Sequence, residues 1–262
     1  MTPTRGIRLN AGQQDAVDEV LAGDSNVFII GSAGTGKSEV IKSIQRMFTG
    51  PGRVVVCATT GAAASIIGGK TFHSALGTKV FSDKDNVKDI LERVGGQPAV
   101  VASIRSMRML IIDEISMATS FYIVVLKAIL EHFRDSRTAF GGVLKIVLVG
   151  DLKQLPPVVV KRRYEDNDQF NARVAASWCF KADDWSSLNL KYYFLTEIVR
   201  TDDPQLRAMV SRIANGSLDP SDELVLEKRK IKESCLCHPT REWFFVPLTG
   251  SEIESIWKFL TT

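Results

Sequence analysis

The residues most able to do chemistry form a glycine-rich segment near the N-terminus. They match the pattern G-x-x-x-x-G-K-[ST] in full and are Gly31, Ser32, Ala33, Gly34, Thr35, Gly36, Lys37 and Ser38. In this pattern, backbone N–H groups turn inward around phosphate oxygens, and the helix that follows adds a favourable dipole. We expect Lys37 to reach the β- and γ-phosphates of a nucleotide, and the hydroxyl of Ser38 to ligate Mg²⁺. A purely structural glycine turn is the alternative interpretation.

Two adjacent acids follow the apolar run Leu110–Ile112. Asp113, at the carboxyl end of a buried strand, would hold Mg²⁺ directly or through water, and Glu114 would polarise the attacking water. Gln154 lies just after another apolar run and is placed to contact the γ-phosphate or that water. These residues favour nucleotide hydrolysis.

Several classes of phosphate-loop protein have signatures that this chain can be tested against. A GTPase normally carries an Asn-Lys-x-Asp segment that reads the base, and a transporter ATPase carries Leu-Ser-Gly-Gly-Gln; both are absent. A small-molecule kinase remains open, although the acid pair Asp113 and Glu114 fits water activation better.

The elements that must position these residues alternate between strands and helices, which is typical of a parallel sheet with crossover helices. The apolar runs predict strands at Asn26–Ile30, Arg53–Cys57, Met109–Ile112 and Leu144–Val149. Helical spacing of apolar residues predicts helices at Gln13–Leu21, Lys37–Phe48, Phe121–Phe133, Gln205–Ile213 and Ile253–Leu260, with Asn215-Gly216 capping the fourth. The predicted fold class is α/β, a parallel sheet of the P-loop NTPase type flanked by helices.

Composition restricts the setting more than the partner. The 262 residues are 45% hydrophobic and 24% charged, as in ordinary globular proteins, and a net charge of +3 neither requires nor excludes nucleic acid. No apolar run reaches membrane-spanning length, and the N-terminus lacks the apolar core of a secretory signal. Four cysteines form no disulfide framework, and Cys235, Cys237 and His238 lack the usual spacing of zinc ligands. We expect an intracellular protein in a reducing compartment, without a membrane partner.

The order of six motifs resembles the petite-integration-frequency (PIF) DNA helicases, the RecD-like branch of the superfamily-one helicases. The motifs are Leu9-Asn10-x-x-Gln13, Gly31–Ser38, Ala58–Ala64, Gly69-x-Thr71-x-His73-Ser74, Asp113–Met117 and Gly150-Asp151-x-x-Gln154-Leu155-Pro156-Pro157. The resemblance extends over about residues 7 to 216. It implies a RecA-like fold, ATP and Mg²⁺ as cofactors, and single-stranded or forked DNA as partner.

The resemblance also implies roles for individual positions. Gln13 would read the adenine edge and favour ATP, although a polar residue is ordinary at the start of a helix. Thr59, Thr60 and Gly61 would approach the phosphates of a DNA strand, and His73 and Ser74 would belong to an adjoining strand-contact segment; a structural histidine is the alternative. The neighbouring Phe72 would stack a base or lie in the core, and Gln154 would couple the γ-phosphate to the DNA groove.

Arg200 matches the arginine of the family's fourth motif, which contacts the γ-phosphate and stabilises charge in the transition state. The flanks depart from that motif, because Val199 stands in place of its aromatic residue and Thr201 in place of its glutamine. A surface arginine is the alternative here.

Helicases of this family have two RecA-like domains, and this chain ends about 45 residues after Gly216. We therefore expect residues 1–216 to be the first motor domain and residues 217–262 to be a stub of an incomplete second domain. The implied function is ATP-dependent unwinding in the 5′-to-3′ direction, in DNA replication, repair, recombination or telomere maintenance. A protein partner or a missing C-terminal domain would complete the motor.

Two other functions stay open. One is a non-motor module that binds ATP and single-stranded DNA without unwinding, and the other is a P-loop phosphotransferase. A eukaryotic protein of this kind would act in the nucleus or the mitochondrion.

Overall fold

The structure is a computed structural model of the chain, and it describes residues 8–49, 52–134, 139–142, 144–199, 203–214, 217 and 219–228. Contacts group the chain into two compact units, Met1–Glu197 and Ile198–Thr262. The boundary between them precedes the one predicted at residue 216. The assignment of residues 217–262 as the start of a second motor domain stays a prediction.

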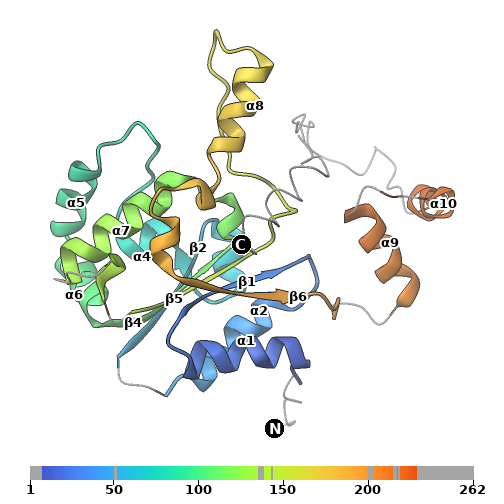
Figure 1. The fold of residues 1–262 in the computed structure, drawn as a ribbon, viewed down its shortest axis with the longest axis horizontal. Coiled ribbons are helices and arrows are strands. Elements are labelled where there is room, and N and C mark those ends of the chain that lie inside the picture. Colours follow the sequence, from blue (N-terminus) through green and yellow to red (C-terminus); the bar gives the residue numbers. More distant parts are fainter. Residues whose placement is uncertain are drawn as a thin grey trace. The chain divides into compact units, whose positions relative to one another are not determined.

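The first unit is built on a six-stranded parallel sheet in the order β3-β2-β4-β5-β1-β6 (Figure 1). The strands are β1 (Asn26–Gly31), β2 (Arg53–Ala58), β3 (Lys70–Thr71), β4 (Met107–Asp113), β5 (Lys145–Gly150) and β6 (Leu190–Leu195). Every pairing is parallel, so each connection must cross over the sheet. The predicted α/β sheet is confirmed, and so are its four predicted strands.

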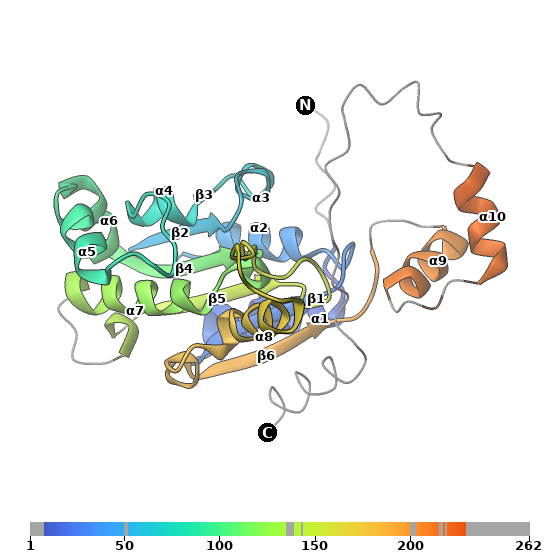
Figure 2. The ribbon, with the colours of Figure 1, turned by 90° about the horizontal axis from the view of Figure 1, so that it is seen from above.

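Helices lie on both faces of this sheet (Figures 1 and 2). They are α1 (Ala11–Ala22), α2 (Lys37–Met47), α3 (Gly61–Ile66), α4 (Phe72–Leu76), α5 (Val87–Gly95), α6 (Pro98–Ser106), α7 (Ser120–Arg134) and α8 (Asn167–Ala176). Short 3₁₀ turns are η1 (Ile115–Met117), η2 (Ala139–Gly141), η3 (Cys179–Lys181) and η4 (Trp185–Leu188). The helices predicted around α1, α2 and α7 are confirmed.

The core follows from alternation along the central strands. Val27 and Ile29 of β1 pack with Val17 of α1 and Ile41 of α2 in one buried cluster. Phe28, between them, points to the opposite face, where its ring meets Trp185 at a centroid distance of 6.0 Å. Because both faces of the sheet are covered, the middle residues of the central strands are apolar, and polar residues stand near the strand ends.

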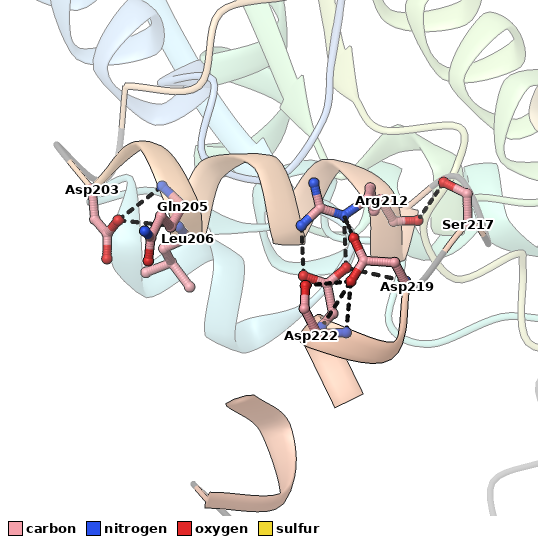
Figure 3. A network of polar contacts seen from close by, with 8 residues as sticks. Asp203, Gln205, Leu206, Arg212, Ser217, Asp219 and Asp222 are labelled. Atoms are coloured by element: carbon pink, nitrogen blue, oxygen red, sulfur yellow. Dashed lines mark hydrogen bonds and ion pairs between the residues drawn. The ribbon is translucent and has the colours of Figure 1, made fainter. Parts of the chain in front are cut away.

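The second unit contains helices α9 (Pro204–Ala214) and α10 (Pro220–Lys228). Asp203 accepts from the backbone N–H groups of Gln205 and Leu206 and so caps α9 (Figure 3). The guanidinium of Arg212 donates two bonds of 2.6 Å to the buried carboxylate of Asp222, which joins the two helices (Figure 3). These bonds lower the pKa of Asp222. The helix predicted over Gln205–Ile213 is confirmed, whereas its predicted cap at Asn215-Gly216 and the helix at Ile253–Leu260 lie outside the described residues.

Within the described part of the chain, no helix is both long and apolar enough to cross a membrane. Cys57 and Cys179 are free, and burial raises the pKa of each thiol to about 12, which makes both poor nucleophiles and ligands. Cys235, Cys237 and His238 lie outside the described residues.

Candidate nucleotide site and adjoining groove

The parallel sheet brings the predicted motifs to one edge, because the carboxyl ends of parallel strands lie together. The phosphate loop follows β1, and Thr59 follows β2. Glu114 follows β4, and Asp151 follows β5. In the sheet, Ala58 is paired with Asp113, Ile112 with Leu148 and Ile30 with Gly150, so these four strands end close to one another.

The phosphate loop owes its shape to glycines in left-handed backbone. Gly34 and Gly36 have φ of 86° and 81°, a region that side chains with a Cβ rarely adopt, and α2 begins directly afterwards at Lys37. Gly31 is required for space: a Cβ there would lie 2.5 Å from Oγ1 of Thr35 and 3.0 Å from Cβ of Leu195. Ala33, Gly34 and Ser38 are placed in this loop and the first turn of α2 as predicted.

Lys37 is buried, and its ammonium lies within the loop itself. Nζ donates to the carbonyl oxygens of Gly31, at 2.7 Å, and Ser32, at 3.2 Å. A phosphate oxygen placed in the loop would be a charged acceptor for the same three-donor group and would bind it more strongly than a carbonyl. The predicted contact of Lys37 with phosphate stays a prediction.

Gln13 lies beneath this loop and is 3% exposed. Its Oε1 accepts from the backbone N–H of Asn10 at 3.0 Å, while Oδ1 of Asn10 accepts from the N–H of Gln13 at 2.9 Å, a reciprocal capping box at the start of α1. Its Nε2 donates to the carbonyl oxygen of Thr35 at 2.9 Å. A carboxamide has a second N–H and a second lone pair, and those of Gln13 have no partner among the described residues. Its predicted contact with adenine stays a prediction.

Asp113 and Glu114 sit at the end of β4, opposite the lysine. Burial raises the pKa of Asp113 to about 6, while the N–H of Glu114, 2.9 Å from its Oδ1, and the charge of Lys37 oppose that rise. A buried carboxylate with a raised pKa is short of positive charge and is suited to a divalent cation. Glu114 has φ of 54°, a strained conformation for a residue with a side chain, and such strain is common at functional sites.

Asp151 and Gln154 complete this edge after β5. The buried carboxylate of Asp151 accepts from the backbone N–H of Lys153 and from Nε2 of Gln154, each at 3.0 Å. Gln154 is exposed, and while its Nε2 is held by Asp151, its Oε1 is accessible. Its predicted contact with the γ-phosphate or the water stays a prediction.

A groove of about 730 Å³ lies beside these residues, within the first unit. Thr59 and Thr60 line it together with the turn at Met117, the loop Phe81–Lys84 and the start of α7. The remaining lining comes from the segment before α8 and from α8 itself: Val158, Val159, Val160, Lys161, Arg162, Arg173, Ala176 and Ser177. Sequence patterns did not predict this second wall, since its residues carry no motif and have no periodic apolar spacing.

Aromatic side chains form one side of the groove. Phe81 and Tyr122 both line it, with ring centroids 4.7 Å apart, and Phe121 lies 5.7 Å from Phe81. Phe72 is buried and contacts both Phe81 and Tyr122, so of its two predicted roles the core position is confirmed. His73 is half-buried in this cluster, and its Nε2 lies 3.1 Å from the hydroxyl of Tyr122.

His73 and Ser74 do not line the groove. Burial lowers the pKa of His73, which favours the neutral imidazole, and Ser74 is exposed with its N–H bonded to Oγ1 of Thr71. Their contact with a strand stays a prediction. Gly61 begins α3 next to Thr60, and a Cβ at Gly61 would meet no atom within 4 Å.

The basic side chains of the groove include one arginine in an ion pair and others that are exposed. Arg173 donates to both carboxylate oxygens of Glu165, at 2.8 and 2.6 Å, and this pair lowers the pKa of Glu165 to about 2. Lys84 and Arg162 are exposed at the groove walls. Basic groups beside aromatic rings are typical of surfaces that bind single-stranded nucleic acid. Arg200, the predicted transition-state arginine, lies outside the described residues.

Comparison with known proteins agrees with this geometry. Residues 8–222 match the family model described as PIF1-like helicase. The ATP-dependent DNA helicase RRM3 of Saccharomyces cerevisiae is 32% identical over 213 residues, which are 80% of this chain and 28% of that protein. The ATP-dependent DNA helicase Pif1 of Bdellovibrio bacteriovorus is 29% identical over 218 residues, which are 83% of this chain and 46% of that protein. The chain thus spans less than half the length of these relatives.

Solved structures give the same result. The Pif1 helicase of Candida albicans superposes with a TM-score of 0.69 and 29% identity, over 84% of this chain and 47% of that one. A Pif1 helicase from Bacteroides in complex with ADP-AlF3 and ssDNA has a TM-score of 0.69 and 25% identity, over 97% of this chain and 57% of that one. The RecA-like fold expected for the first unit is confirmed.

Proposed function

The chain belongs to the PIF1-like helicase family, and from this premise we propose that it provides the first, nucleotide-binding motor domain of an ATP-dependent DNA helicase. The observation that carries the proposal is the shared edge of the sheet. The phosphate loop and the acids of β4 lie there beside Thr59 and Thr60, which line a groove with basic and aromatic walls. A nucleotide site and a strand site would therefore share the ends of strands in one sheet.

ATP and Mg²⁺ suit the residues at this edge. The backbone of the loop and Lys37 would hold the phosphates, and Gln13 would select adenine with its remaining donor and acceptor. Ser38 and Asp113 would hold Mg²⁺, since hydroxyl and carboxylate oxygens are the ligands that this cation prefers. A bound cation would supply positive charge for the phosphates, while Glu114 would polarise the attacking water and Gln154 would contact the γ-phosphate.

Single-stranded or forked DNA would lie in the groove. Thr59, Thr60 and Gly61 would approach its phosphates, and the half-buried rings of Phe121 and Tyr122 at the groove wall would contact its bases. The Bacteroides relative named above is in complex with ssDNA. Movement in the 5′-to-3′ direction, and work in replication, repair, recombination or telomere maintenance, in the nucleus or mitochondrion of a eukaryote, are further parts of this proposal.

A non-motor role is the second candidate, because the chain spans only 28% and 46% of the two helicases compared. A motor of this kind steps by opening and closing two domains around ATP. A second domain, in the same protein or in a partner, would supply another arginine in addition to Arg200 of this chain, together with the remaining strand-binding motifs. Without it, this chain would bind ATP and DNA but unwind nothing.

The test is steady-state ATP hydrolysis by the 262-residue chain, with and without single-stranded DNA. Hydrolysis that DNA stimulates, and that both Lys37→Ala and Glu114→Gln abolish, would support a competent motor site. Tight ATP binding that Lys37→Ala removes and Glu114→Gln keeps, with negligible turnover in all three proteins, would identify half a motor. Hydrolysis unchanged in both variants would refute the assignment.

A further inference from the structure

Thr59 connects the groove to the acids of the nucleotide site through both of its hydrogen-bond donors. Its backbone N–H donates to the carbonyl oxygen of Asp113 at 3.2 Å. Its hydroxyl donates to the carbonyl oxygen of Glu114 at 2.8 Å. Thr59 also lines the groove, so one residue faces the strand site and bonds to the backbone of both acids.

The carbonyl of Glu114 is bonded to a second residue of the groove. It accepts from the N–H of Met117 at 3.1 Å, which closes the turn η1, and Met117 lines the groove as Thr59 does. Glu114 itself has φ of 54°. Left-handed backbone at a residue with a side chain is strained and persists only where neighbours hold it. The hydroxyl of Thr59 is one of the groups that hold it.

A hydroxyl has a single proton, and a phosphate oxygen can only accept. Thr59 therefore can donate to a strand phosphate only by releasing the carbonyl of Glu114. Thr60 differs, since its Oγ1 accepts from the N–H of Ala63 at 3.3 Å. Its proton has no acceptor among the described residues and can bond to a phosphate at no such cost.

We propose that Thr59 is a positioning residue that couples strand binding to the nucleotide site. Its hydroxyl donates a hydrogen bond to the carbonyl of Glu114 in the absence of a strand and to a strand phosphate in its presence. This inference rests on the proposed function. With the hydroxyl on Glu114, the backbone of the acid is held in its strained form. With the hydroxyl on a phosphate, the carbonyl of Glu114 keeps the bond from Met117 but loses the bond from Thr59. The strained backbone at Glu114 then has one support fewer, and its carboxylate can reorient. Thr60 contributes affinity for the strand, and Thr59 contributes the coupling between strand binding and nucleotide binding.

The experiment measures the dissociation constant of a fluorescein-labelled thymidine oligonucleotide by anisotropy, with and without saturating AMP-PNP and Mg²⁺, on the full chain. The ratio of the two constants is the coupling factor, and linkage makes it equal for either ligand. We expect a factor of about 5 or more in the wild type, which is the lower end of common allosteric coupling. Thr59→Val, which keeps the shape and removes the hydroxyl, should bring the factor close to 1, and Thr59→Ser should restore it.

Thr60→Val is the matched control from the same groove. It should weaken oligonucleotide binding and leave the coupling factor as in the wild type. A coupling factor kept in full by Thr59→Val, or lost in Thr59→Ser as completely as in Thr59→Val, would overturn the inference. A wild type that binds both ligands with a factor of 1 would overturn it too and leave the proposed function intact. A wild type that binds neither ligand would overturn the proposed function itself.

If the Thr59→Val variant fails to fold, a measurement on the wild type alone still tests the inference. The amide of Met117 donates to the same carbonyl of Glu114. When the hydroxyl of Thr59 no longer supports the strained backbone at Glu114, this turn should open more often, so saturating oligonucleotide should raise the hydrogen-exchange rate of the Met117 amide. If the oligonucleotide leaves the hydrogen-exchange rate of the Met117 amide unchanged, the proposed change of acceptor at the Thr59 hydroxyl is contradicted.

Discussion

The side-chain amide of Gln13 donates to the carbonyl oxygen of Thr35 across 2.9 Å, and so joins the first helix to the phosphate loop. Both residues are almost fully buried, at 3% and 1% exposure. The residue expected to read the base is thus also a support for the loop that would hold the phosphates. Its two roles can be separated by experiment.

Gln13→Ala removes the donor to Thr35 and the acceptor for Asn10, and leaves the buried carbonyl of Thr35 and the half-buried N–H of Asn10 without these bonds. We expect the free energy of unfolding to fall by about 1–3 kcal/mol. ATP affinity should fall more than GTP affinity, because only adenine matches the remaining donor and acceptor of the glutamine. Denaturant unfolding and nucleotide titration measure the two effects.

Gln14→Ala is the matched control, since Gln14 makes a single exposed bond, to Asp18. It should change the free energy of unfolding by less than about 0.5 kcal/mol. Equal losses of ATP and GTP affinity in Gln13→Ala would show that Gln13 supports the loop and reads no base.

Two glycines test the difference between a packed loop and an open surface. Gly31→Ala places a Cβ 2.5 Å from Oγ1 of Thr35, so it should destabilise the chain by about 1–3 kcal/mol and weaken nucleotide binding. Gly61→Ala meets no atom within 4 Å and begins a helix, so it should leave stability unchanged or raise it slightly. If a strand passes close to this backbone, however, the same methyl group should weaken oligonucleotide binding.

Thermal unfolding and oligonucleotide anisotropy measure these outcomes. Unaltered oligonucleotide affinity in Gly61→Ala would place the strand away from the start of α3. A Gly31→Ala variant as stable as the wild type would show that Thr35 and Leu195 can move aside.

The sequence was sufficient for elements that carry a local signal. The phosphate loop is a contiguous motif, and the central strands are apolar because both sheet faces are covered, so their positions could be predicted. The strand β3 has two residues, too few for any period, and β6 is an edge strand with mostly half-buried residues. The helix α8 has no buried residue and projects from the sheet (Figure 1), so it lacks the apolar stripe by which helices are predicted.

The groove could not be predicted because it is assembled by the fold. Thr59, Phe81, Tyr122 and Arg162 come from four distant segments, and no spacing in the sequence relates them. The bond between Thr59 and Glu114 joins residues 55 positions apart, and it depends on the pairing of β2 with β4. Motifs indicated which residues matter, whereas only the topology indicates which of them touch.

His73 predicts a pH dependence of stability. Its folded pKa is lowered by burial, so the unfolded chain binds more protons below the unfolded pKa of about 6.5. The contribution of the neutral His73 to the free energy of unfolding is therefore fully present above that pH. It is lost as the pH falls from there to the folded pKa. The slope has an upper limit of about 1.4 kcal/mol per pH unit. A protonated imidazole carries an N–H on both ring nitrogens, so it could only donate to the hydroxyl of Tyr122.

His73→Gln keeps an acceptor and does not titrate, so the difference between its unfolding profile and that of the wild type isolates the histidine. Parallel profiles between pH 8 and pH 5 would contradict the prediction.

Asp222→Asn should loosen the second unit alone. The asparagine keeps one acceptor but loses the charge that meets Arg212 through two bonds of 2.6 Å. We expect faster hydrogen exchange in α9 and α10, with unchanged exchange in the strands of the first unit, since the two units are separately compact. Equal protection of α9 and α10 in both proteins would show that this ion pair does not hold them together.

Salt dependence tests whether the groove binds phosphates. The logarithm of the affinity for single-stranded DNA should fall linearly with the logarithm of salt concentration, by about 0.7 for each phosphate neutralised. Lys84 is exposed at the groove wall, so Lys84→Ala should reduce that slope by about 0.7.

Lys42 is also exposed but belongs to α2 and does not line the groove, so Lys42→Ala should leave the slope unchanged. The slope separates a phosphate contact from a general change in net charge, because both variants remove one positive charge and only one removes it from the groove. Equal slopes in the two variants would mean that the strand does not pass Lys84.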